Sequence, residues 1–129
     1  MNRRLLIVDD NRGVRFLLRE LLSTEGYEVL EAANGREALF YSTNSDLSLV
    51  LLDVKMPGMT GLEVLDKLKS SNPDLPVILM SAYSEMELLN KALEFHPKVL
   101  FLSKPFDLNN VRELIKNTFI YTPPLDKLE

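Results

Sequence analysis

The sequence predicts an α/β protein with a doubly wound parallel sheet of five strands and five helices. Short aliphatic runs alternate with amphipathic segments of helical period along the whole chain, as in repeated strand–helix units. Four of these runs are apolar throughout, which is typical of strands buried on both faces of a parallel sheet; they are residues 5–8, 49–52, 77–80 and 99–102. A barrel of eight such units would need about twice this length, so we expect an open sheet with helices on both faces.

The first part of the chain contains two strand–helix units. The run 5–8 precedes a helix that ends near Gly26, on which apolar residues recur at helical spacing. Residues 27–32 alternate weakly between apolar and acidic side chains, which indicates an edge strand with one wetter face. Asn34 and Gly35 then open a second helix.

The rest of the chain repeats this pattern. Its expected elements are, in order, the strand ending at Asp53, a loop over 57–61, a helix from Leu62 to Asn72, the strand 77–80, a helix over 85–95, the strand 99–102 and a helix containing Val111, Leu114 and Ile115. The paired prolines at 123–124 cannot continue a helix. We therefore expect one domain over residues 1–120 and a short extended or frayed tail over 121–129, in which Leu128-Glu129 is either native sequence or a cloning remnant.

Composition is typical of a soluble protein in a reducing compartment. The 129 residues are enough to bury the core of one domain, and 15 basic against 19 acidic residues give a formal charge of −4. This charge argues against non-specific binding to nucleic acid. The absence of cysteine excludes disulfides and thiolate metal sites. No stretch resembles a signal peptide or is long enough to cross a membrane, so we expect a cytoplasmic protein with no membrane contact.

Polar side chains follow the predicted strands at the point where each strand ends. They are Asp9, Asp10, Asp53, Ser81 and Lys104. Parallel strands end at the same edge of a sheet, so these side chains are expected to converge. Taken singly, the acids and the serine can cap the helices that follow, and the lysine can be a surface residue. Together, three carboxylates at one edge repel each other and need a cation, and their hard oxygen ligands suit Mg²⁺.

Three acids, a lysine and a hydroxyl around Mg²⁺ form a site suited to a phosphoryl group. The glycine-rich loops that hold nucleotides, GxGxxG and GxxxxGK followed by Ser or Thr, are both absent from the sequence. The phosphoryl group is therefore not expected on a tightly held nucleotide. An aspartate can itself be the nucleophile and form an aspartyl phosphate, and Asp53, at the end of an aliphatic run, is our candidate.

Four ordered motifs at these strand ends resemble those of a known family. They are Val8-Asp9-Asp10, the stretch Leu52-Asp53-Val54-Lys55-Met56-Pro57-Gly58-Met59-Thr60-Gly61, Ser81-Ala82-Tyr83 and Lys104-Pro105-Phe106. With them, residues 4–119 resemble the receiver domain of two-component response regulators, a flavodoxin-like fold with strand order 2-1-3-4-5. Lys55 and the run Ala32-Ala33-Asn34-Gly35 are most similar to stand-alone receivers of sporulation-type phosphorelays.

The resemblance implies a single-domain response regulator, which is a phosphoacceptor signalling protein rather than an enzyme. Asp53 would accept a phosphoryl group from a phosphohistidine. Asp10, Asp53 and the backbone carbonyl of Lys55 would bind Mg²⁺ directly, and Asp9 would bind it through water. The protein would then relay the group or signal by a conformational switch, and would lose phosphate slowly by itself.

The same resemblance implies roles for residues around the acceptor. Lys104 would pair with the phosphoryl oxygens, in a loop that can hold a cis bond to Pro105. Ser81 would move inward to hydrogen-bond the phosphate. Phe101 stands where an aromatic side chain commonly swings between outward and inward rotamers, and its alternative interpretation is a core aromatic. Lys55 and Tyr83 would shield or align the water that removes the phosphate.

The implied partners are a sensor histidine kinase, a histidine phosphotransferase, or both. We expect a monomer that does not contact nucleic acid directly. The predicted docking surface combines side chains of the first helix with side chains around the site: Arg12, Val14, Arg15, Leu17, Leu18, Tyr83, Pro105 and Phe106. This prediction depends on exposed apolar residues lying beside the acid cluster.

Two other functions are weaker alternatives at this point. A Mg²⁺-dependent phosphatase of the haloacid-dehalogenase type needs an aspartate two residues after the nucleophile, where this chain has Lys55. A flavin or nucleotide binder needs a phosphate loop of Ser, Thr and Gly after the first strand, which this chain lacks. His96 departs from the family pattern, and because it precedes Pro97 we expect it in a solvated loop, not as a phospho-donor or metal ligand.

Overall fold

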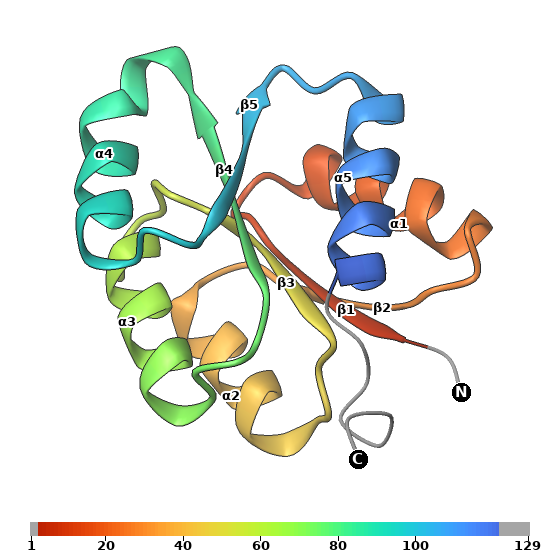
Figure 1. The fold of residues 1–129 in the computed structure, drawn as a ribbon, viewed down its shortest axis with the longest axis horizontal. Helices are drawn as coiled ribbons and strands as arrows, with labels where there is room; N and C mark the ends of the chain where they lie inside the picture. The colour runs from red at the N-terminus through yellow and green to blue at the C-terminus, as the bar shows by residue number, and fades with distance from the viewer. Residues whose placement is uncertain (1–2, 122–129) are drawn as a thin grey trace.

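The computed structural model describes residues 3–121, in which strands and helices alternate along the chain (Figure 1). The strands are β1 (Arg4–Val8), β2 (Glu28–Ala32), β3 (Leu49–Asp53), β4 (Val77–Ala82) and β5 (Leu100–Lys104). The helices are α1 (Arg12–Thr24), α2 (Gly35–Asn44), α3 (Gly61–Ser71), α4 (Met86–Phe95) and α5 (Leu108–Tyr121), and the short 3-10 turn η1 (Tyr83–Glu85) precedes α4.

The strands are parallel and lie in the order β2-β1-β3-β4-β5, which confirms the predicted fold. Successive side chains of a strand point to opposite faces of the sheet, so each central strand contributes to two core layers. Leu6 and Leu52 belong to the layer with α2, α3 and α4, and Ile7 and Leu51 belong to the layer with α1 and α5. Figure 1 shows these two groups of helices on opposite faces of the sheet.

Side-chain caps fix where the helices next to the site begin. Asn11 Oδ1 accepts a hydrogen bond from the Val14 N–H at 3.0 Å, which starts α1. Thr60 and Glu63 form a reciprocal capping box that starts α3. These caps hold the loops that follow β1 and β3, so the residues at both strand ends are held at fixed positions.

β5 departs from the prediction that every apolar run is buried. It is an edge strand, and Leu100 and Phe101 are 39% and 47% exposed, whereas Leu102 is buried. No further strand–helix unit covers the outer side of an edge strand, so its apolar side chains remain partly in solvent. The interpretation of Phe101 as a core aromatic is therefore wrong.

His96 lies just after α4, as expected from the proline that follows it. Its Nε2 lies 2.6 Å from Asp66 Oδ1 on α3, and its side chain is only 21% exposed. The ring is therefore half-buried and paired with an aspartate rather than freely solvated, because the packing of α3 beside α4 brings Asp66 to it.

The last helix ends one residue later than the predicted domain boundary at residue 120. Tyr121 is the last residue of α5, although the sequence placed it in the tail. The rest of that tail, with Leu128-Glu129, lies outside the described residues. No helix within residues 3–121 is long and apolar enough to cross a membrane.

Candidate functional site

The structure brings together the acids that the sequence places at strand ends. Asp53 is the last residue of β3, and Asp9 and Asp10 directly follow β1. One carboxylate oxygen from each of the three lies within 4.8 Å of the others. Lys104, the last residue of β5, and Ser81, near the end of β4, lie at the same edge of the sheet.

Lys104 connects two of these acids. Its Nζ donates a hydrogen bond to Asp9 Oδ2 at 2.8 Å and lies 3.3 Å from Asp53 Oδ1. Burial would lower the pKa of Lys104, but the hydrogen bond to Asp9 and the negative charge of Asp53 outweigh burial and raise that pKa. Lys104 therefore remains a cation at neutral pH. The bond between Lys104 and Pro105 is cis.

Asp53 is a buried acid whose surroundings disfavour its charged form. Burial and the neighbouring Asp9 carboxylate raise the pKa of Asp53 to about 6, with a smaller contribution from Glu85, although Lys104 lowers it. Its Oδ1 has no hydrogen-bond partner among the described residues, because the contact with Lys104 is an ion pair without hydrogen-bond geometry. A buried carboxylate oxygen without a hydrogen bond is available to bind a cation or to attack an electrophile.

Asp9 and Asp10 differ in how they are held. Asp9 is fully buried, and its Oδ1 accepts a hydrogen bond from the Asn11 N–H at 2.9 Å while its Oδ2 binds Lys104. Asp10 is exposed. One acid of the pair is therefore a fixed buried charge, and the other is open to solvent.

This donor set fits a hard divalent cation. Three carboxylates lie together, and Lys104 alone cannot neutralise them. The Asp53 oxygen that accepts no hydrogen bond and the exposed carboxylate of Asp10 are oxygen donors of the kind that Mg²⁺ prefers. The acid cluster could therefore hold a metal ion.

The other predicted site residues lie around the cluster at different depths. Ser81 is buried near the end of β4, with 2% of the residue exposed. Phe101 is half-exposed on β5, Lys55 is exposed after β3, and Tyr83 is 91% exposed at the start of η1. The roles that the resemblance implies for these four residues remain predictions.

Two site features were missed by reasoning from the sequence. Glu85 contributes to the raised pKa of Asp53, and its Oε1 accepts a hydrogen bond from the Ala82 N–H at 2.9 Å. Gly61 lies so close to the carbonyl of Asp53 that a Cβ atom there would meet it at 2.4 Å. A glutamate three residues after a strand end and a glycine at a helix start were the available signals, and neither pointed to the site by itself.

The predicted docking surface needs one correction. Leu18 is fully buried in the core beneath α1, because α1 turns this side chain toward the sheet, so it cannot contact a partner. Leu17 is 46% exposed, and its neighbour Phe16, which the prediction missed, is 62% exposed. Of the remaining predicted contacts, Arg12, Tyr83 and Pro105 are exposed, and Val14, Arg15 and Phe106 are half-buried.

Comparison with known proteins assigns this fold and site to a class. The sequence profile of the response regulator receiver domain matches residues 5–116, and the chain belongs to this family. Sporulation initiation phosphotransferase F of Bacillus subtilis (strain 168) is 42% identical over 116 residues, which cover 90% of this chain and 93% of that protein. The chain is therefore a phosphoacceptor module of the two-component and phosphorelay type, whose phosphodonors are proteins such as histidine kinases or phosphotransferases.

Solved structures agree with this assignment. A CheY-like response regulator receiver domain protein from Methanospirillum hungatei JF-1 superimposes with a TM-score of 0.88 at 30% identity, covering 95% of this chain and 97% of that chain. The receiver domain of NtrX from Brucella abortus superimposes with a TM-score of 0.82 at 29% identity, covering 90% of this chain and 98% of that chain.

Proposed function

We propose that Asp53 accepts a phosphoryl group from a phosphohistidine of a partner protein. The buried Oδ1 of Asp53 is the observation that supports this proposal best: it has no hydrogen-bond partner within residues 3–121 and lies 3.3 Å from Lys104 Nζ. A carboxylate oxygen of Asp53 attacks phosphorus, and the phosphorus–nitrogen bond breaks. The electron pair of that bond leaves with the imidazole, whose other ring nitrogen already carries a proton in the phosphohistidine, so the leaving group is neutral imidazole.

Mg²⁺ is the cofactor that this donor set suits best. Asp10, Asp53 and the backbone carbonyl of Lys55 would bind it directly. Asp9 would act through water, because both of its oxygens already accept hydrogen bonds, from the Asn11 N–H and from Lys104. When bound, the ion neutralises the carboxylates and the phosphoryl oxygens during transfer.

The chain's own side chains stabilise the phosphorylated state. Lys104 exchanges its contact with Asp53 for a phosphoryl oxygen, because the phosphoryl group adds nearly two negative charges at this position. The Ser81 hydroxyl is buried close by and turns toward the phosphate. The space that it leaves is filled by Phe101, which is half-exposed on the adjacent strand and swings inward.

The function is tested by incubating the protein with acetyl phosphate, with and without Mg²⁺. We expect a gain of one phosphate per chain that is stable in acid, labile in base, dependent on Mg²⁺ and absent from Asp53→Asn. Slow loss of the adduct is expected, because exposed Lys55 and Tyr83 flank the route of an attacking water. Rapid continuous release of phosphate without an adduct would instead indicate a phosphatase and would overturn the proposal.

The partner is proposed to dock where apolar side chains of α1 and of the strand-end loops are exposed beside the acids. Leu17 on α1 is 46% exposed, and Tyr83 on η1 is 91% exposed. A helical bundle that presents a phosphohistidine fits a surface of this kind, since an apolar rim excludes water while phosphorus is transferred. The α1 and strand-end contacts would both be made by a single monomer of this chain.

Leu17→Ala is expected to slow phosphoryl transfer from the cognate histidine protein by about 10-fold, because a central apolar contact contributes more than 1 kcal/mol to binding. Its rate with acetyl phosphate should be that of the wild type. Phe40→Ala removes an aromatic side chain that is 61% exposed on α2 and serves as the control. Wild-type transfer rates for Leu17→Ala from the protein donor would refute this docking surface.

A further inference from the structure

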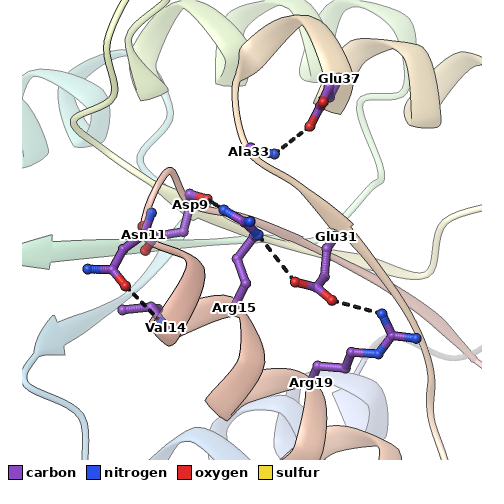
Figure 2. Close-up of polar contacts among 8 residues, drawn as sticks. All are labelled: Asp9, Asn11, Val14, Arg15, Arg19, Glu31, Ala33 and Glu37. Carbon is purple, nitrogen blue, oxygen red and sulfur yellow. Dashed lines mark hydrogen bonds and ion pairs between the residues drawn. The ribbon is translucent and has the colours of Figure 1, made fainter.

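Arg15 on α1 contacts the backbone between the two acids that follow β1 (Figure 2). Its Nη1 donates a hydrogen bond to the carbonyl oxygen of Asp9 at 2.7 Å. That carbonyl belongs to the peptide bond that joins Asp9 to Asp10. Arg15 therefore restrains the backbone from which both carboxylates extend.

Arg15 is itself held by an acid on β2. Glu31 Oε1 accepts a hydrogen bond from Arg15 Nε at 3.2 Å, and Glu31 Oε2 accepts one from Arg19 Nη1 at 2.8 Å. Figure 2 shows the Glu31 carboxylate between the two guanidinium groups. The Arg15 side chain is only 15% exposed, against 55% for Arg19. Arg15 is therefore turned into the structure, although the sequence suggested that it contacts a partner.

The amide side of Asp9 is anchored to the same strand. The Asp9 N–H donates to the carbonyl of Ala32, at the end of β2, at 3.1 Å. Both backbone polar groups of Asp9 are thus tied to β2, one directly and the other through Arg15 and Glu31. β2 therefore holds the backbone of Asp9 in place.

We propose that Arg15 is a positioning residue for the cation site, and that Glu31 fixes Arg15 in that role. This inference rests on the proposed function, because it concerns Mg²⁺ at the acid cluster. Residues that hydrogen-bond to metal ligands and orient them commonly contribute about 10- to 100-fold to metal affinity. For Arg15 we expect a contribution of about 10-fold. The residue never touches the phosphoryl group.

The alternative is that Arg15 only fastens α1 to β2. Arg19 provides the matched control, because it makes the other hydrogen bond to Glu31 and lies one helical turn further along α1, without contacting Asp9. Arg15→Gln and Arg19→Gln each remove one cation and one ion pair with the same acid. Only Arg15→Gln also removes the hydrogen bond to the Asp9 carbonyl.

An effect of charge and an effect of positioning predict opposite changes in the Mg²⁺ affinity of Arg15→Gln. If Arg15 acted only as a nearby cation, its loss would strengthen Mg²⁺ binding, since like charges repel. If it positions the acids, its loss weakens binding, because Asp10 no longer points at the ion. A weaker affinity for Arg15→Gln therefore cannot come from the change in charge.

The experiment is a Mg²⁺ titration of the unphosphorylated full chain, followed by the backbone amide signals of Asp10 and Asp53 in proton–nitrogen spectra. Thermal unfolding of each variant is measured without metal. We expect Arg15→Gln to raise the Mg²⁺ dissociation constant about 10-fold, and Arg19→Gln to leave it within about 2-fold of wild type. Both should lower the unfolding temperature, Arg15→Gln more than Arg19→Gln, because Arg15→Gln loses a second hydrogen bond from a more buried side chain. Glu31→Gln, which loosens Arg15 without removing it, should weaken Mg²⁺ binding to an intermediate extent.

Wild-type affinity for Arg15→Gln, or equal weakening by Arg19→Gln, would overturn the inference and leave the proposed function intact. If Arg15→Gln does not fold, Glu31→Gln decides: wild-type Mg²⁺ affinity in that variant also overturns it. If the wild-type chain neither binds Mg²⁺ nor forms an acetyl phosphate adduct, the proposed function fails, and the inference fails with it.

Discussion

In metal-free buffer at about pH 8, Asp53→Asn is expected to be more stable than the wild type by up to about 3 kcal/mol. The reason is the pKa of the Asp53 carboxyl, which burial and the Asp9 charge raise to about 6 in the folded protein. The difference between this pKa and the ordinary pKa of an aspartate corresponds to a free energy of about 3 kcal/mol. The folded state therefore holds the proton more tightly than the unfolded state does.

The sign of the pH dependence follows from this shift. The favourable contribution of protonated Asp53 is fully present below its ordinary pKa and is lost as the pH rises through about 6. Asparagine carries no charge at any pH, so Asp53→Asn does not lose stability as the pH rises through this range. The gain of Asp53→Asn over wild type should thus shrink as the pH falls from about 8 to about 5.

Urea unfolding at both pH values in the presence of a chelator measures this difference. Asp46→Asn, at an exposed acid outside the cluster, is the control and should change stability little at either pH. Mg²⁺ at 100 times its dissociation constant should stabilise the wild type by about 2.7 kcal/mol, which would nearly remove the difference in stability between the wild type and Asp53→Asn. A stability difference that is the same at both pH values would contradict the electrostatic account of Asp53.

Gly61→Ala is expected to destabilise the protein by about 3 kcal/mol, near the upper end of what overpacking costs. A Cβ atom at this position would lie 2.4 Å from the carbonyl oxygen of Asp53 and 2.6 Å from Val54 Cα. Both are backbone atoms, so no rotamer change relieves the contact. The end of β3 must shift, and Mg²⁺ binding should weaken together with stability.

Gly58→Ala is the matched control in the same loop. Gly58 has φ of +82°, and a Cβ there would find no atom within 4 Å. Its cost is therefore the backbone strain of a left-handed residue, about 1 to 2 kcal/mol, without a clash. Denaturant unfolding and a Mg²⁺ titration of both variants check the difference, and equal effects would mean that close approach to Asp53 is not what requires Gly61.

The fold and the acid cluster were predictable because they depend on local pattern and on one topological rule. Aliphatic runs identify the strands, and parallel strands place Asp53 and Lys104 at one edge of the sheet. Burial on a helix was less predictable: Leu17 and Leu18 are chemically alike, and only the rotation of α1 against the sheet exposes one and buries the other. The exposure of Phe101 likewise depends on β5 being an edge strand.

Side-chain contacts between distant elements could not be predicted from the sequence. The pair of His96 with Asp66 links α4 to α3, and the contact of Arg15 with Glu31 links α1 to β2. Each depends on distances set by the packing of whole helices. Neither pair has a spacing in the sequence that distinguishes it from ordinary surface charges, so both pairs are evident only in the folded structure.

Asp53 is expected to accept the phosphoryl group, and Asp9 and Asp10 are not. Borohydride reduction of the protein treated with acetyl phosphate and Mg²⁺ converts an aspartyl phosphate to homoserine, which peptide mass spectrometry locates along the chain. We predict homoserine at position 53 alone, and only when Mg²⁺ and acetyl phosphate are both present. Homoserine at position 9 or 10, or none in a protein that carries phosphate, would contradict the assignment.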